Sequence, residues 1–174
     1  DAESFRLELR AVKRVMDSGL DNVRIMLPFV RFPRELEYCR QLITEEGLFE
    51  TPGFELWMMA ELPSNVLLIE EYLPYVSGVS IGSNDLTQLT LGLDRDSGLV
   101  AHLFDERDPA VRKMLEMAIE ACQKQDKYVG ICGQAPSDYP DLAAWLVEQG
   151  ISSLSLNPDS VIETWLDLAR RQAG

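Results

Sequence analysis

Five short apolar runs alternate along the chain with segments of helical periodicity, and this alternation limits the fold more than any other feature. The runs occupy residues 22–28, 55–60, 76–82, 127–132 and 151–156. Several are apolar without a break, as is typical of parallel strands that are covered on both faces. A helical segment follows each run, which predicts five consecutive strand–helix units of an α/β protein.

The helices are predicted from apolar positions three or four residues apart, and from Pro and Gly near their ends. One helix is expected over residues 3–18, before any strand. The others are expected over residues 32–46, 65–73, 109–125, 139–149 and 159–172, with a short helical turn over 84–91. Residues 94–108 are polar and predict a long loop, and such loops often carry function in compact domains.

Strand–helix units either close into a barrel or lie open as a doubly wound sheet. No Gly-x-Gly-x-x-Gly string follows the first strand, which disfavours the dinucleotide-binding open sheet. Reactive side chains follow several strands, where an α/β barrel carries its active site. A complete barrel has eight strands in roughly 250 residues, so residues 1–174 are expected to form the C-terminal part of a TIM (β/α)8 barrel domain.

The formal net charge of −13 disfavours nucleic acid as a partner. No apolar run approaches the ~20 residues of a membrane helix, and the first residues do not resemble a secretion signal. Cys39, Cys122 and Cys132 form no CxxC pair, which argues against disulfides or a zinc site. Reduced thiols and a cytoplasmic location are therefore expected.

Polar residues that follow three predicted strands define the candidate site. Their side chains are two carboxylates, a hydroxyl, an amide, a guanidinium and a thiol. The residues are Glu61, Ser83, Asn84, Asp85, Arg95 and Cys132. Strand ends of a parallel sheet meet at one edge, so a single shared site is expected.

Glu61 and Asp85 are the candidate metal ligands, because Mg²⁺ favours oxygen ligands and usually takes one or two carboxylates. Alternatively, both are loop acids that cap nearby helices. Arg95 is suited to bind a phosphate or carboxylate bidentately. Its alternative role is an ion pair within its own acidic loop, with Asp94, Asp96 or Asp105.

Asn84 could donate to a phosphate oxygen, or it could simply shape a turn. Cys132 ends a strand and is the candidate for proton transfer, although a buried, inert thiol is the commoner role of a single cysteine. Cys39 and Cys122 lie on predicted helices and are expected to be structural. The single histidine, His102, is also expected to be structural, and the three tryptophans are expected to pack in the core.

Four strings mark the predicted strand ends. They are Ile25-Met26-Leu27-Pro28-Phe29, Ala60-Glu61-Leu62-Pro63, Ser80-Ile81-Gly82-Ser83-Asn84-Asp85-Leu86-Thr87-Gln88 and Cys132-Gly133-Gln134. Together, and with the downstream Asp94-Arg95, they resemble the C-terminal barrel of the phosphoenolpyruvate-utilising enzymes. The resemblance covers nearly the whole chain.

The resemblance implies a role for each position. Glu61 and Asp85 match Mg²⁺ ligands that also lie at the substrate, and Asn84 and Arg95 match residues that bind the phosphoryl group. Cys132 matches the acid/base that exchanges a proton with the substrate carbon. The implied ligands are pyruvate and phosphoenolpyruvate, and the implied cofactor is Mg²⁺.

The resemblance is strongest to the branch that converts ATP, pyruvate and water to phosphoenolpyruvate, AMP and phosphate. Ser83, whose backbone would line the pocket, stands where other branches usually have Thr, and Gln134 stands where they usually have Glu. This resemblance implies a transferase with paired acceptors, in which a phosphohistidine on another domain of the same enzyme phosphorylates pyruvate. The alternatives are a branch that forms phosphoenolpyruvate with inorganic phosphate as the second acceptor, and one that passes the phosphoryl group of phosphoenolpyruvate to a carrier.

No glycine-rich nucleotide-binding segment and no phosphohistidine motif occur in these 174 residues. The chain is therefore expected to be part of a larger multidomain enzyme and to be inactive alone. Barrels of this family often dimerise, which implies a homo-oligomer. A purely structural role as a dimerisation module is a further alternative.

Overall fold

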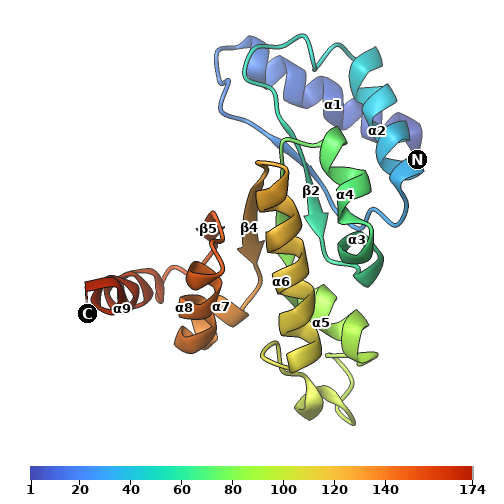
Figure 1. The fold of residues 1–174 in the computed structure, drawn as a ribbon. Coiled ribbons are helices and arrows are strands. Elements are labelled where there is room, and N and C mark those ends of the chain that lie inside the picture. Colours follow the sequence, from blue (N-terminus) through green and yellow to red (C-terminus); the bar gives the residue numbers. More distant parts are fainter. Residues whose placement is uncertain (174) are drawn as a thin grey trace.

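The computed structural model describes residues 1–173, and its centre is a sheet of five parallel strands. Figure 1 shows the strands with helices packed around them. The strands are β1 (Ile25–Leu27), β2 (Leu56–Ala60), β3 (Gly78–Gly82), β4 (Tyr128–Cys132) and β5 (Ser153–Leu154). Each lies inside one of the five predicted runs, although β1 and β5 are shorter than predicted.

The strands lie in the sheet in the same order as in the chain, β1-β2-β3-β4-β5. A doubly wound sheet instead reverses its strand order at a switch point. Sequential parallel order is the arrangement of consecutive units in an α/β barrel, so the fold predicted from the sequence is confirmed.

Most of the helices that precede or follow these strands lie where the sequence predicted them, although more helices form than were predicted. They are α1 (Ala2–Asp17), α2 (Pro33–Glu45), α3 (Pro63–Leu67), α4 (Ile69–Tyr72), α5 (Ser83–Leu91), α6 (Pro109–Lys124), α7 (Ala135–Asp138), α8 (Pro140–Glu148) and α9 (Val161–Ala173). Two 3₁₀ turns add η1 (Leu73–Tyr75) and η2 (Ala101–Leu103). Helix α6 packs on β3 and β4, as Figure 1 shows.

The prediction of a single helix over residues 65–73 is wrong, because the segment forms α3, α4 and η1. Leu68 leaves helical geometry, with φ −117° and ψ 25°, and separates α3 from α4.

The prediction that Ser64 is the N-cap of this helix is also wrong. The N-cap is Leu62, and the Asn65 Oδ1, inside the first turn, accepts from the backbone N–H groups of Glu61 and Leu62 just before the helix at 3.3 and 3.0 Å. Pro63 has no N–H of its own, so it is tolerated at the start of the helix.

The core lies between the sheet and its helices, and every residue of β3 is buried. Helix α9 departs from this pattern. Ile162 and Trp165 on α9 are 63% and 66% exposed, so the expectation that all three tryptophans pack in the core is wrong for Trp165. Within residues 1–173, no helix is long and apolar enough to cross a membrane.

Candidate functional site

The carboxyl ends of β2, β3 and β4 lie side by side, and this register gathers the candidate residues. Ala60 pairs with Ile81, and Gly82 pairs with Cys132. The residues that follow β2 and β3 therefore project from the same edge as Cys132. This edge is where α/β barrels carry their active sites.

Glu61 follows β2 and is held between the turn after β1 and the end of β3. It is only 4% exposed, and its Oε1 accepts from the backbone N–H of Phe29 at 2.7 Å. Phe29 has a left-handed backbone, with φ 54°, which aims this N–H at the carboxylate. A Cβ placed on Gly82 would lie 2.9 Å from Glu61 Oε2, so the missing side chain of Gly82 makes room for the carboxylate. Glu61 does not cap a helix.

The surroundings of Glu61 disfavour the ionised form of its carboxyl group. Burial raises the pKa of Glu61, the Phe29 N–H lowers it, and the neighbouring Asp85 raises it. The negative charge of Asp85 thus disfavours the ionised form of Glu61. Within the described chain, no group of three or more His, Cys, Asp or Glu side chains could hold a metal ion. A pair of carboxylates still suits Mg²⁺, which usually completes its coordination with substrate oxygens and water.

Glu61→Gln should raise the unfolding temperature of the barrel domain in metal-free buffer at neutral pH. Because the folded pKa of Glu61 is raised, its contribution to stability is full below the ordinary pKa and is lost as the pH rises through the raised value. The amide still accepts from Phe29 without a buried charge. The increase should be roughly 2–4 °C per kcal/mol of penalty removed, measured on full-length protein by calorimetry.

The matched control is Glu55→Gln, just before the other end of β2. Arg24 holds the pKa of Glu55 below its usual range, so the ionised form stabilises the fold above the ordinary pKa. The control should leave the unfolding temperature unchanged or lower it slightly. If Glu61→Gln also lowered the unfolding temperature, the ionised Glu61 carboxylate would not be destabilising.

Arg95 reaches the site from the loop after α5. Its Nη1 lies 3.7 Å from Asp85 Oδ2, and its backbone N–H donates to Gln88 Oε1 at 3.2 Å. The alternative that Arg95 pairs with Asp94, Asp96 or Asp105 is therefore wrong. The two side chains of the pair are 37% and 32% exposed, so water screens their attraction. Arg95 can therefore turn to an arriving anion at small cost.

The first turn of α5, which directly follows β3, is joined by hydrogen bonds to the turn after β4. Ser83 Oγ donates to the backbone carbonyl of Cys132 at 3.1 Å, and the backbone N–H of Gln134 donates to Asn84 Oδ1 at 3.3 Å. Gly133, between these contacts, has φ +118°, and a Cβ there would overlap Ser83 Oγ. Cys132, at the end of β4, is half-buried. Only glycine at position 133 allows this close approach.

Gly133→Ala should lower both stability and turnover. The left-handed backbone and the overlap with Ser83 Oγ would force the Cys132–Gly133 turn to move, and strain of this kind amounts to about 1–3 kcal/mol. Turnover in the full-length enzyme should fall more than stability explains, because Cys132 moves with the turn. The control is Gly19→Ala, which has φ +99° but no atom within 4 Å of its Cβ and should not alter turnover. Equal activity in the two variants would show that the turn does not position Cys132.

Nothing in the sequence pattern marks Glu106, which lies in the predicted polar loop but is only 3% exposed. The other cysteines agree with expectation. Burial raises the pKa of Cys39, and it raises the pKa of Cys122 to about 12, so both thiols stay protonated. His102 is exposed on η2.

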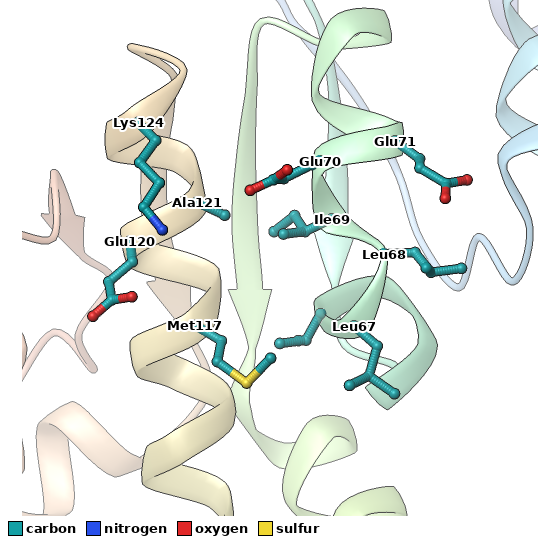
Figure 2. Close-up of a pocket in the computed structure, with 10 residues that line it drawn as sticks. Leu67, Leu68, Ile69, Glu70, Glu71, Met117, Glu120, Ala121 and Lys124 are labelled. Carbon is teal, nitrogen blue, oxygen red and sulfur yellow. The ribbon is translucent and has the colours of Figure 1, made fainter.

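A hollow of about 410 Å³ lies away from this edge, between α3–α4 and α6. Figure 2 shows Leu67 and Glu70 on one side of it and Met117 and Lys124 on the other. None of the six candidate residues lines it. Its shape therefore does not bear on the chemistry at the strand ends.

The sequential parallel sheet, with polar and charged side chains gathered at its carboxyl edge, places the chain among the α/β-barrel domains. Within that class the chain belongs to the PEP-utilising enzymes, because residues 1–173 match the model of that family's PEP-binding domain.

Three relatives are named phosphoenolpyruvate synthase. The chain is 63% identical to the protein of Neisseria meningitidis over 169 residues, 60% to that of Pseudomonas aeruginosa over 172 residues, and 58% to that of Escherichia coli over 169 residues. These alignments cover 96%, 98% and 96% of this chain, but only 21%, 22% and 21% of the relatives. The chain thus spans about a fifth of the length of the curated relatives it matches.

Proposed function

We propose that this chain is the catalytic, pyruvate-binding part of an enzyme that converts ATP, pyruvate and water to phosphoenolpyruvate, AMP and phosphate. ATP would first phosphorylate a histidine on another domain, and that histidine would then deliver its phosphoryl group here. The observation that carries the proposal is the joining of the first turn of α5 to the turn after β4, which holds the end of β4 at Cys132 beside Asn84.

Cys132 is the group that moves a proton. Its thiolate takes one hydrogen of the pyruvate methyl group as a proton, which leaves the enolate and a neutral thiol. The hydrogen bond from Ser83 Oγ to the Cys132 carbonyl fixes the backbone from which the thiol projects. Proton transfer by a positioned group typically contributes 10²–10⁴-fold to a rate.

Asn84 and Arg95 orient the phosphoryl group. Asn84 Oδ1 already accepts from Gln134, so its amide N–H groups remain for a phosphoryl oxygen. Arg95 keeps further guanidinium N–H groups beside its long contact with Asp85. Phosphoryl transfer requires mostly orientation and charge stabilisation, which these two side chains provide.

Glu61 and Asp85 are the residues that would hold Mg²⁺. When bound there, the ion supplies Lewis-acid stabilisation of negative charge on the enolate oxygen. The mutual repulsion of the two carboxylates in the described structure favours a cation at this position.

The test is product analysis with the full-length protein, ATP, pyruvate and Mg²⁺, with and without added inorganic phosphate. Phosphoenolpyruvate, AMP and inorganic phosphate should form in equal amounts, as followed by ³¹P NMR. Pyrophosphate in place of phosphate would mean that inorganic phosphate is the second acceptor. Phosphorylation of a separate carrier by phosphoenolpyruvate, with no need for ATP, would overturn the proposal.

A further inference from the structure

Asn65 is a polar side chain that the proposed chemistry leaves unused, although it is completely buried. It lies in the first turn of α3 and is 0% exposed. Burying an amide is unfavourable unless its polar atoms find hydrogen-bond partners. The partners of the Asn65 amide therefore indicate its role.

The two polar atoms of this amide contact the backbone of two different segments. Oδ1 of Asn65 accepts from the N–H groups of Glu61 and Leu62, directly after β2. Nδ2 of Asn65 donates to the backbone carbonyl of Val30, in the segment after β1, at 2.5 Å. A single buried side chain thus joins the carboxyl ends of β1 and β2.

The same two segments meet a second time at the Glu61 carboxylate. Glu61 Oε1 accepts from the backbone N–H of Phe29 at 2.7 Å, and Phe29 directly precedes Val30. The three hydrogen-bonded residues form a closed ring: Asn65 holds the backbone of Glu61 at one side and the neighbour of Phe29 at the other. The ring therefore fixes both the backbone of Glu61 and the donor to its carboxylate.

The segment after β1 needs such a contact, because Phe29 has a left-handed backbone with φ 54°. A bulky residue keeps this conformation only where the surrounding structure enforces it. The Val30 carbonyl, one residue further on, is 35 positions from Asn65 in the sequence and is held by it. Without that contact, the Phe29 N–H would no longer be aimed at Glu61.

We propose that Asn65 is a positioning residue for Glu61 and, through Glu61, for a divalent cation at the carboxyl edge of the sheet. The inference rests on the proposed role of Glu61 as a Mg²⁺ ligand. Carboxylate ligands are generally held by hydrogen bonds from a second layer of residues, and loss of such a partner weakens metal binding roughly 10–100-fold. Asn65 acts through the backbone and does not itself ligate the ion.

Two replacements in the full-length protein remove the Asn65 contacts to different extents. Asn65→Leu keeps a similar volume and removes all three hydrogen bonds. Asn65→Ser keeps a hydroxyl that can accept from the Leu62 N–H, but it lacks the amide that joins both segments. Both variants should unfold at a lower temperature than wild type, because buried backbone groups lose their partners. Asn65→Ser is the milder change and carries the test if Asn65→Leu does not fold.

Two measurements separate positioning of Glu61 from a general loss of stability. In calorimetric titrations with oxalate, both variants should need roughly 10–100-fold more Mg²⁺ than wild type for half-maximal binding, and saturating Mg²⁺ should restore the binding. In metal-free protein, amide hydrogen exchange should accelerate in the peptide that contains Phe29, because its N–H loses a fixed acceptor. Exchange in a peptide from α6 should change little.

The matched control is Gln123→Leu. Gln123, on α6, also places a side-chain amide on the backbone of a distant segment: its Nε2 donates to the carbonyls of Gln149 and Gly150 at 2.7 and 3.2 Å. These carbonyls precede β5, at the opposite end of the sheet from Glu61. The control should lower the unfolding temperature slightly and leave both the Mg²⁺ requirement and the exchange of Phe29 unchanged.

The inference is overturned if the Asn65 variants need no more Mg²⁺ than wild type, if Gln123→Leu raises the Mg²⁺ requirement as much, or if exchange accelerates evenly along the chain. Glu61→Ala is the reference. If that variant keeps Mg²⁺-dependent oxalate binding, the metal site of the proposed function fails. If it loses this binding while the Asn65 variants bind like wild type, only the inference about Asn65 fails.

Discussion

Replacing Cys132 by Ala in the full-length enzyme should abolish formation of phosphoenolpyruvate from pyruvate, while phosphorylation of the histidine by ATP continues. Cys132 lies at the end of β4, beside the first turn of α5 that carries Asn84 and Asp85, and its backbone carbonyl accepts from Ser83 Oγ. Histidine phosphorylation would take place on other domains and would not need this edge. Turnover and histidine labelling should be measured side by side on one preparation.

Cys39→Ala is the matched control, because Cys39 is a half-buried thiol on α2 whose raised pKa leaves it protonated. The control should keep full turnover. A rate in Cys132→Ala within about tenfold of wild type would contradict the proton-transfer role, since such groups typically contribute 10²–10⁴-fold.

The second large effect concerns the metal. Asp85→Ala should abolish Mg²⁺-dependent binding of oxalate, which mimics the pyruvate enolate, because the site loses one of its two carboxylates. The loss in affinity should exceed the roughly 10–100-fold that follows removal of an outer-shell partner. Calorimetric titration of the full-length protein, with and without Mg²⁺, measures it.

Asp94→Ala is the control for the charge of this region. Asp94 lies next to Arg95, and the structure gives it no contact with Glu61 or with the Asp85 carboxylate. Oxalate affinity should be nearly unchanged in this variant. If Asp85→Ala bound oxalate as tightly as wild type in the presence of Mg²⁺, Asp85 would not be a metal ligand.

The five strands could be predicted because each is a short apolar run bounded by polar or turn-forming residues. Their order in the sheet follows from the barrel hypothesis, which the sequential pairing now supports. Strand ends shifted because β1 and β5 have only one sheet neighbour each, so fewer of their residues are held in extended geometry. The break in the helix at Leu68 could not be predicted from the sequence, because the apolar residues around it continue the helical periodicity.

Five of the six candidate residues could be proposed because strand ends mark them in the sequence, and Arg95 could be proposed because it lies in the polar loop that follows α5. Their partners could not, since partners depend on how the turns lie in space. Arg95 has three acids nearby in its loop yet contacts Asp85. Glu106 lies in a run of charged residues and is buried. Neither the Arg95–Asp85 contact nor the burial of Glu106 can be read from the local amino-acid composition.

The most direct test of the central claim is a crystal structure of the full-length protein with Mg²⁺ and oxalate. The account predicts that both bind at the carboxyl edge of β2, β3 and β4. Glu61 and Asp85 should ligate the ion, and the Cys132 thiol should face the oxalate. Oxalate bound elsewhere, such as in the hollow between α3–α4 and α6, with these three side chains making no contact to it or to the ion, would contradict the account.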